Sequence, residues 1–209
     1  MSVSSDSVFV LDDDPVLLSL LRHELAGQGH AVETFRSSAS FFERIGEEEP
    51  DGCLVLDLCL NEESGLAIQE KLVQRGSRLP IVFISGQGDV RTTAQAMRSG
   101  AVDFLVKPFF SRELFAAVGN ALERGRRRRE WQAGRAHAER RLQRLTPRER
   151  EVCMHVASGQ LNKHIAAALG TTEKTIKVHR ARAMAKLEVS SVAELVRLID
   201  RAAAPDCTG

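Results

Sequence analysis

Four apolar runs of the sequence each end in side chains that could handle a phosphoryl group. These side chains are carboxylates, a hydroxyl and an ammonium, and they belong to Asp12, Asp13, Asp14, Asp57, Ser85 and Lys107. Carboxylates that converge repel one another unless a hard cation lies among them, and oxygen ligands suit Mg²⁺. A lysine and a hydroxyl could bind the oxygens of a phosphoryl group, and a carboxylate could accept it. The residue types therefore indicate metal-assisted phosphoryl chemistry.

Asp57 also has a plainer interpretation, because a single aspartate at a strand end often only caps the next turn. The residues before it, Cys53-Leu54-Val55-Leu56, show no polar alternation. Such a run is typical of a strand covered on both faces in a parallel sheet, and ligands of these sheets gather beyond the carboxyl ends of the strands. Because other strand ends have matching groups, the sequence favours the chemical role.

Five repeats of strand then helix must position these residues. The predicted strands are short and apolar, and they are Val8–Leu11, Ala31–Phe35, Cys53–Asp57, Ile81–Ile84 and Phe104–Val106. A helix-periodic run follows each one. The alternation predicts an α/β fold, a (βα)5 doubly wound parallel sheet. Right-handed crossovers then bring all five carboxyl ends to one edge of the sheet.

The charges divide the chain into an acidic and a basic half. Residues 1–120 contain 10 Lys/Arg and 18 Asp/Glu, whereas residues 121–209 contain 19 and 10. The basic half has the charge balance expected for binding a phosphate backbone. No apolar run approaches the length of a membrane span, and the four cysteines show no C-x-x-C spacing. We expect a cytoplasmic protein with reduced thiols and no membrane partner.

Between the halves, residues 122–145 consist mostly of good helix formers and include the arginine run Arg126–Arg129. Trp131, Ala138, Leu142 and Leu145 recur at helical spacing, which predicts a long linking helix with a narrow apolar seam. The arginines could form a solvated face or contact phosphates, and the seam could pack against a second subunit.

The basic half predicts four helices. The first begins at Thr146-Pro147-Arg148-Glu149, a capping box, and a second short helix spans Lys163–Leu169. A turn at Gly170 leads to a longer helix over Glu173–Leu187, so the pair is typical of a helix-turn-helix that places its second helix in the major groove. In that helix we expect Ile176, Arg180, Met184 and Leu187 to form the stripe that packs, which leaves its basic side free.

Four motifs of the acidic half resemble the receiver domain of two-component response regulators. They are Val10–Pro15, Cys53–Asp57, Pro80–Gly86 and Gly100–Phe109. The resemblance implies that Asp57 accepts a phosphoryl group from a sensor histidine kinase. Lys107 would contact that group, Ser85 would hydrogen-bond to it, and the ring of Phe104 would swing inward when Ser85 moves.

The same resemblance implies a metal site and a distinct loop. Asp12, Asp13, Asp57 and the backbone carbonyl of Cys59 would bind Mg²⁺, and Asp14 would cap the first helix. After Asp57 the loop Cys59–Gly65 lacks the Met-Pro pair common in the family and has two extra acids. Cys59 and Gln87 occupy the positions that adjust the lifetime of the aspartyl phosphate in that family.

Three motifs of the basic half resemble the LuxR-type DNA-binding domain: Thr146–Val152, Asn162–Ala166 and Thr175–Arg182. By this resemblance Lys177, Val178 and Ala181 face base edges. Residues nearer to phosphates are Thr175, His179, Arg182 and Lys186. A fourth helix containing Val192, Leu195, Val196 and Ile199 would serve dimerisation.

Together these features are similar to the NarL/FixJ family of transcriptional regulators. We expect a receiver domain over residues 1–122, a helical linker over 123–142 and a DNA-binding domain over 143–205. The implied function is DNA binding controlled by phosphorylation of Asp57, without enzymatic turnover beyond slow self-dephosphorylation. The partners would be a sensor histidine kinase, double-stranded promoter DNA, RNA polymerase and a second copy of the chain. The alternatives are a phosphorylation-independent DNA-binding regulator and an Mg²⁺-dependent phosphohydrolase using Asp12 and Asp14.

Overall fold

The computed structural model describes residues 7–46, 50–86 and 90–204. The chain divides into two compact units, Met1–Arg127 and Arg128–Gly209. Among the described residues no helix is both long enough and apolar enough to cross a membrane.

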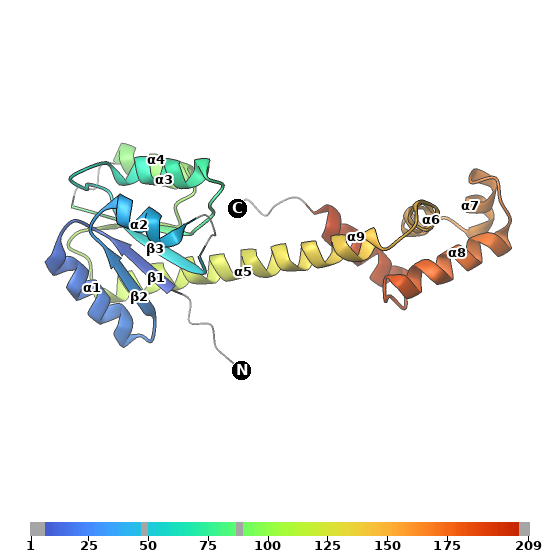
Figure 1. The fold of residues 1–209 in the computed structure, drawn as a ribbon, viewed down its shortest axis with the longest axis horizontal. Helices are drawn as coiled ribbons and strands as arrows, with labels where there is room; N and C mark the ends of the chain where they lie inside the picture. The colour runs from blue at the N-terminus through green and yellow to red at the C-terminus, as the bar shows by residue number, and fades with distance from the viewer. Residues whose placement is uncertain (1–6, 47–49, 87–89, 205–209) are drawn as a thin grey trace. The chain divides into compact units, whose positions relative to one another are not determined.

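The amino-terminal unit alternates strands and helices (Figure 1). Its strands are β1 Ser7–Leu11, β2 Ala31–Phe35, β3 Gly52–Asp57, β4 Ile81–Ser85 and β5 Asp103–Val106. Its helices are α1 Pro15–Gly27, α2 Ser38–Ile45, α3 Gly65–Gln74, α4 Val90–Arg98 and the beginning of α5 Ser111–Gln143. The strands pair in the order β2-β1-β3-β4-β5, and all pairs are parallel. The predicted (βα)5 doubly wound sheet is confirmed.

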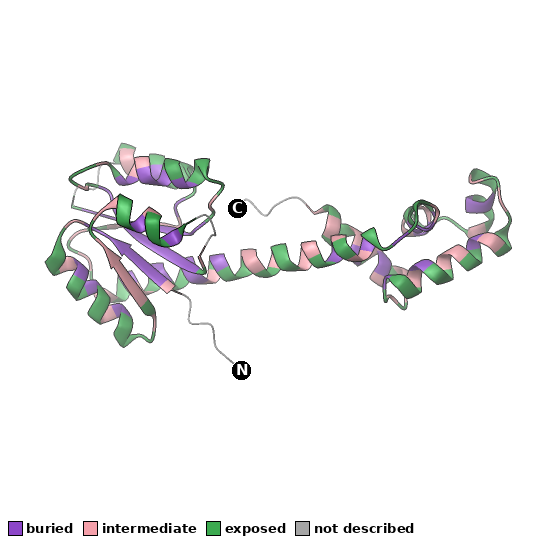
Figure 2. Cartoon of the chain, viewed as in Figure 1, coloured by how far each residue is buried: buried purple, intermediate pink, exposed green. Residues whose placement is uncertain are grey.

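Alternating side chains of the strands form one core on each face of the sheet. Val8, Val10 and Val55 pack with α1 and α5, whereas Phe9 and Leu56 pack with α2, α3 and α4. The central strand β3 is buried at every position, as its purple ribbon shows in Figure 2. Burial on both faces explains why this strand has no polar alternation.

Helix α5 is one continuous helix of 33 residues. Its amino-terminal part buries Leu114, Val118 and Leu122 against the sheet. Its carboxyl-terminal part buries Ala138 and Leu142 in the core of the second unit. The predicted apolar seam is therefore filled from Ala138 onward by residues of the same chain, and Gly125 and Gly134 do not interrupt the helix.

The carboxyl-terminal unit contains α6 Pro147–Ala157, α7 Asn162–Ala168, α8 Glu173–Lys186 and α9 Val192–Ala203. The predicted capping box at α6 is confirmed, because the Glu149 amide donates to the Thr146 hydroxyl and the Thr146 amide donates to Glu149. Helices α7 and α8 are joined by a short turn in which Gly170 has a φ of 61°. This arrangement is a helix-turn-helix.

Candidate phosphoryl-acceptor site and nucleic-acid interface

The predicted site residues meet at the carboxyl edge of the sheet. Strands β1 and β3 are neighbours with Leu11 opposite Leu56, so the next residue of each strand, Asp12 and Asp57, comes to the same edge. Lys107 directly follows β5, and Ser85 ends β4. The topology thereby brings together groups that are 95 and 50 residues apart in the sequence.

One ammonium group joins the two buried carboxylates. Lys107 Nζ lies 2.8 Å from Asp12 Oδ2 and 2.8 Å from Asp57 Oδ1. Asp12 is 1% exposed and Asp57 is 3% exposed. Two carboxylates therefore share a single cation, and the cluster keeps an excess of negative charge in a place with little water.

Backbone amides engage the remaining oxygens of the pair. The Cys59 amide donates to Asp57 Oδ2 at 2.9 Å, and the Asp14 amide donates to Asp12 Oδ1 at 2.8 Å. Asp57 does cap the turn after its strand, as the plainer interpretation expects. This contact uses Oδ2, whereas Lys107 binds Oδ1.

Burial and hydrogen bonding shift the acid–base equilibria at this edge. Burial raises the pKa of Asp12 above its ordinary 3.8, although the hydrogen bonds from Lys107 and the Asp14 amide oppose this. Burial alone would lower the pKa of Lys107, but its hydrogen bonds to Asp12 and Asp57 outweigh this and raise it above 10.5. The lysine is therefore fully charged, and the surplus negative charge rests on the carboxylates.

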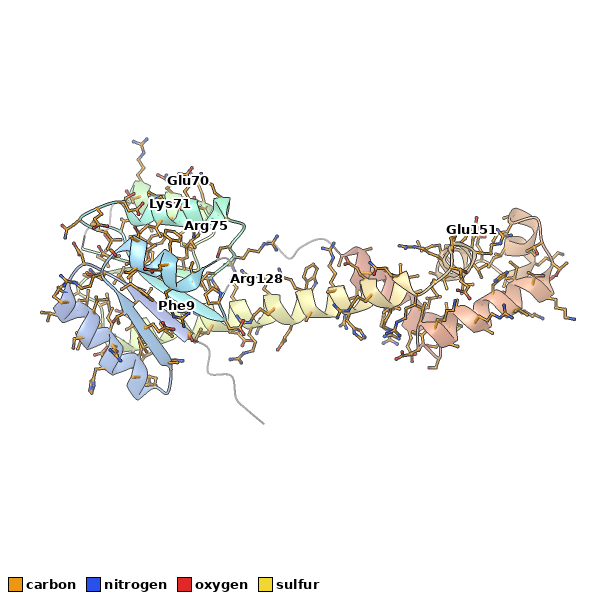
Figure 3. The ribbon with its side chains drawn as sticks, in the orientation of Figure 1. Phe9, Glu70, Lys71, Arg75, Arg128 and Glu151 are labelled. Carbon is orange, nitrogen blue, oxygen red and sulfur yellow. The ribbon has the colours of Figure 1, made fainter. Side chains whose placement is uncertain are left out.

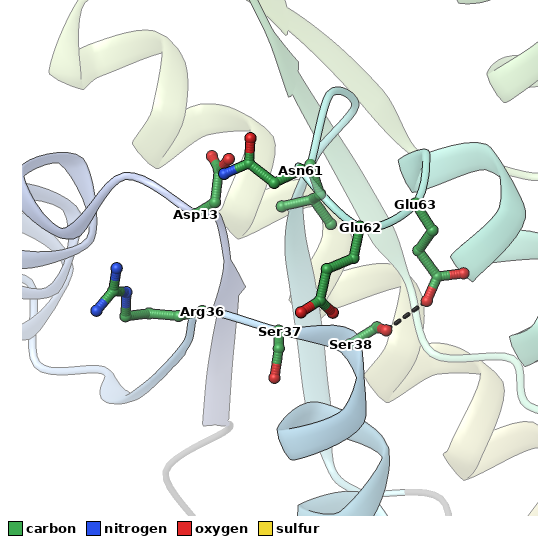
Figure 4. A pocket seen from close by; sticks show the side chains of 8 residues that line it. Asp13, Arg36, Ser37, Ser38, Asn61, Glu62 and Glu63 are labelled. Carbon is green, nitrogen blue, oxygen red and sulfur yellow. Dashed lines mark hydrogen bonds between the residues drawn. The ribbon is translucent and has the colours of Figure 1, made fainter.

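Asp13 lies beside the cluster and lines a pocket of about 330 Å³ together with Arg36, Asn61 and Glu62. Figure 4 shows the Asp13 carboxylate close to the Asn61 side chain. Within the described ranges, no three Asp, Glu, His or Cys side chains converge as a metal-ligand group. The structure thus brings Asp12 and Asp57 together through Lys107 and leaves Asp13 at the border of the cluster.

Oxygen donors and unbalanced negative charge are nevertheless what a hard divalent cation requires. Asp12 and Asp57 supply buried carboxylates, and Asp13 adds a third carboxylate at the same strand end. The chemistry of this donor set fits Mg²⁺.

Ser85 and Phe104 lie on adjacent strands. Ser85 is fully buried and faces Val106 across the β4–β5 pair. Phe104 is half-buried, and its ring centroid lies 6.3 Å from that of Phe83. Gln87 lies outside the described residues. Asp14 caps α1, as predicted, by accepting from the amides of Val16 and Leu17.

The loop between β3 and α3 is fastened at several points that the sequence did not reveal. Glu63 accepts from the Ser38 hydroxyl and from the Lys71 ammonium. The backbones of Cys59 and Ser64 pair in an isolated antiparallel β-bridge. At the end of the loop, a Cβ on Gly65 would meet the Asp57 carbonyl oxygen at 2.5 Å and the Phe83 ring at 3.0 Å. The start of α3 at Gly65 therefore lies too close to the end of β3 at Asp57 to leave room for a side chain.

Helix α8 presents a basic face. Residues exposed on it are Lys174, Lys177, Val178, Ala181, Arg182 and Lys186. Thr175 and His179 are half-buried, and the Thr175 hydroxyl is hydrogen-bonded to that of Thr172 at the helix N-terminus. The large exposed fraction of Val178, 42%, stands out on a helix whose opposite side packs in the core. An apolar side chain on a basic helix face suits contact with base edges.

The inner face of α8 differs from the expected stripe. Ile176 and Leu187 are buried as expected, but Ala183 is the third fully buried residue, while Arg180 and Met184 are only half-buried. Helix α8 contacts both α6 and α7, so its buried face is broader than a single stripe.

Lys186 is engaged within the protein. Its ammonium lies 2.6 Å from Glu149 Oε2, and the Glu149 side chain is only 5% exposed. The hydrogen bonds from Lys186 and from the Thr146 amide lower the pKa of Glu149 to about 2. This link between α8 and the start of α6 spans 37 residues, and no local sequence pattern indicated it.

Comparison with known proteins agrees with both units. The response regulator receiver domain matches residues 8–119, and bacterial regulatory proteins of the luxR family match residues 143–199. The response regulator protein TodT of Pseudomonas putida is 39% identical over 201 residues, which cover 96% of this chain and 88% of TodT. Nodulation protein W of Bradyrhizobium diazoefficiens is 42% identical over 193 residues, which cover 91% of this chain and 84% of that protein.

The solved structure of the response regulator StyR superposes with a TM-score of 0.83 at 40% identity, covering 93% of this chain and 98% of StyR. The fold, the acidic edge and the helix-turn-helix thus define a two-component response regulator that regulates transcription. The chain belongs to the NarL/FixJ family of these regulators. The family assignment made from the sequence motifs is confirmed, and the two domain types imply a sensor kinase partner and DNA binding.

Proposed function

We propose that a sensor histidine kinase phosphorylates Asp57 and thereby controls the DNA affinity of α8. The observation that supports this most directly is the shared ammonium of Lys107 between buried Asp12 and Asp57. In the transfer, a carboxylate oxygen of Asp57 attacks phosphorus and the phosphorus–nitrogen bond to the kinase histidine breaks. The electron pair of that bond stays on the imidazole, and an acyl phosphate forms on Asp57.

Lys107 and a divalent cation divide the charge neutralisation in this proposal. Asp12, Asp13, Asp57 and the backbone carbonyl of Cys59 would hold Mg²⁺, which supplies positive charge to the phosphoryl oxygens when bound. Lys107 is already at Asp57 Oδ1 and binds the phosphoryl group as it arrives. Because one Asp57 oxygen becomes part of the acyl phosphate bond, the ammonium is freed for this contact.

The switch runs through the two neighbouring strands. Ser85 moves to hydrogen-bond the phosphoryl group, and the Phe104 ring follows it inward from its half-buried position beside Phe83. The change favours a homodimer whose two α8 helices reach successive half-sites of promoter DNA. Recruitment of RNA polymerase would follow at the promoter, and slow self-dephosphorylation would end the signal.

On DNA, we assign base-edge contacts to Lys177, Val178 and Ala181. Phosphate contacts fall to Thr175, His179 and Arg182, which lie beside them on α8. Lys186, in contrast, is assigned to the pair with Glu149.

Footprinting on selected operator DNA tests the proposal. The full chain and Asp57→Ala are compared with and without a small phosphodonor and Mg²⁺. We expect the phosphodonor to tighten DNA binding of the wild-type chain by about tenfold or more and to leave Asp57→Ala unchanged. Equal affinity under all conditions would remove the switch and leave a phosphorylation-independent regulator.

The hydrolase alternative gains no support from the geometry. It uses Asp14 in the reaction, whereas Asp14 Oδ1 accepts from the Val16 and Leu17 amides and caps α1. Turnover of a phosphate ester by Asp57→Ala would support this alternative.

A further inference from the structure

The loop that follows Asp57 is held by side-chain contacts of a residue that is not among the expected Mg²⁺ ligands. Residues 58–64 contain no proline, so no ring restricts the backbone of this segment. Yet the Cys59 amide within it binds Asp57, and the Cys59 carbonyl belongs to the expected metal ligands. The loop must therefore be ordered by other contacts before it can hold an ion.

Glu63 supplies such side-chain contacts, in addition to the backbone bridge between Cys59 and Ser64. Its carboxylate accepts from the Ser38 hydroxyl at the first residue of α2, which Figure 4 shows, and from the Lys71 ammonium on α3. Lys71 is labelled on α3 in Figure 3. The Glu63 side chain is only 18% exposed, and the hydrogen bonds from Lys71 and Ser38 lower its pKa. One side chain thus ties the loop to two helices.

A second contact links the same two helices. The guanidinium of Arg75, at the end of α3, lies 4.3 Å from the centroid of the Phe42 ring on α2. Cation–π contact of this kind adds to the attachment of α2 to α3. Because α2 and α3 contact each other, Ser38 and Lys71 are kept in place to bind Glu63.

We propose that Glu63 is a positioning residue that, through Ser38 and Lys71, orders the β3–α3 loop for divalent-cation binding at Asp57. The proposal rests on the proposed function of Asp57. Removal of a group that orients metal ligands without contacting the metal commonly weakens metal binding by about tenfold. The ligands must then be ordered when the metal binds, which costs binding free energy. Glu63 acts in this way, through the loop backbone, without touching the ion.

The neighbouring Glu62 provides a matched control. It is exposed, lines the same pocket and has the same charge, but it is not part of the Ser38 and Lys71 contacts. Replacement of either glutamate removes one negative charge near Asp57. Only replacement of Glu63 removes the contacts of the loop with Ser38 and Lys71.

The experiment measures binding of Mn²⁺, as a probe for Mg²⁺, to the full unphosphorylated chain by electron paramagnetic resonance of the free ion. We expect Glu63→Ala to weaken binding by about tenfold and Glu62→Ala by less than about threefold. Ser38→Ala and Lys71→Met, which each remove one partner and keep Glu63, should weaken it by smaller factors. The exchanged pair Glu63→Lys with Lys71→Glu restores the ion pair but not the hydrogen bond that Glu63 accepts from Ser38, so it should recover part of the affinity that Glu63→Ala loses.

The outcomes separate the two proposals. If the wild-type chain binds Mn²⁺ and Glu63→Ala and Glu62→Ala weaken binding equally, or neither does, the role of Glu63 is disproved while that of Asp57 stands. Failure of the exchanged pair to recover affinity, with both single partner variants at wild-type affinity, disproves it as well. If the wild-type chain binds no Mn²⁺, both proposals fail. Thermal unfolding of each variant confirms that the measured chains are folded.

Discussion

Lys107 of the receiver unit and Lys186 of the DNA-binding unit both donate to buried carboxylates, but negative charge is in excess around Lys107 and balanced around Lys186. Lys107 serves two carboxylates, Asp12 and Asp57, whereas Lys186 serves only Glu149. Burial raises the pKa of Asp12, but hydrogen bonds from Lys186 and the Thr146 amide lower the pKa of Glu149 to about 2. The ammonium group lowers the carboxyl pKa in both pairs, and only at Asp12 does burial outweigh it.

This difference in charge balance suits the two pairs to different roles. Around Glu149 each charge has its counter-charge, so this contact fastens α8 to α6 and nothing further is needed. Around Asp57 the negative charge exceeds the positive, so the cluster is stabilised by any additional cation that arrives. The surplus of buried negative charge at Asp12 and Asp57, and not the ion pair alone, is therefore the feature that supports the proposed function.

The largest effect is expected at the shared ammonium. Lys107→Met should slow phosphoryl transfer to Asp57 from a small phosphodonor by roughly 100-fold, because a positioned cation at the developing charge is lost. Incorporation of phosphate into the full chain measures the rate. Lys163→Met, a change at an exposed lysine of α7, is the control. Equal rates for Lys107→Met and the wild-type chain would show that Lys107, like Lys186, has only a structural role.

Neutralising one acid of each cluster should change stability in opposite directions. Glu149→Gln should lower the free energy of unfolding by about 2 kcal/mol, a value reduced because the Lys186 side chain is 39% exposed and can reach water. Asp57→Asn should raise it by about 1 kcal/mol, because one of two carboxylates competing for Lys107 is removed. Urea unfolding of the full chain measures both. Destabilisation by both variants would contradict the contrast.

The pH dependence of the second unit follows from Glu149. Its pKa is about 2 in the folded protein and 4.5 ordinarily, so its contribution to stability is complete above about pH 4.5. This contribution is lost as the pH falls toward 2. The stability gap between the wild-type chain and Glu149→Gln should therefore shrink between pH 5 and about pH 2.5, as followed by the fluorescence of the single tryptophan, Trp131. A constant gap would show that the pair has no part in it.

The smallest effect distinguishes two basic residues on α8. Arg182→Met should reduce the slope of log affinity for DNA against log salt concentration by about one, because a phosphate contact is removed. Lys186→Met should leave this slope unchanged and lower the stability instead. If both variants reduced the slope equally, Lys186 would be a phosphate contact, as the family resemblance suggested.

The sequence predicted the edge of the sheet well, because strand ends can be located from local patterns. The runs before Asp12, Asp57 and Lys107 have no alternation, and parallel topology requires their ends to meet. The capping roles of Asp14 and Thr146 were equally local and are confirmed.

What could not be predicted depends on contacts between distant segments. Ser38 and Glu63 are 25 residues apart, and Glu149 and Lys186 are 37 apart. The buried position of Ala183 was missed for another reason, since alanine adds little to an apolar pattern and α8 packs on two helices at once. Local periodicity indicates one buried face and cannot show that a second neighbour widens it.

Gly65 limits how this receiver can be altered. A Cβ added at Gly65 would lie 2.5 Å from the Asp57 carbonyl oxygen and 3.0 Å from the Phe83 ring, so no methyl group fits there. The exposed Asn61 and Glu62 are the positions of this loop that can be exchanged with least effect on the strand end, since neither takes part in the contacts of Cys59 and Glu63. A side chain at position 65 would instead require α3 to move away from β3.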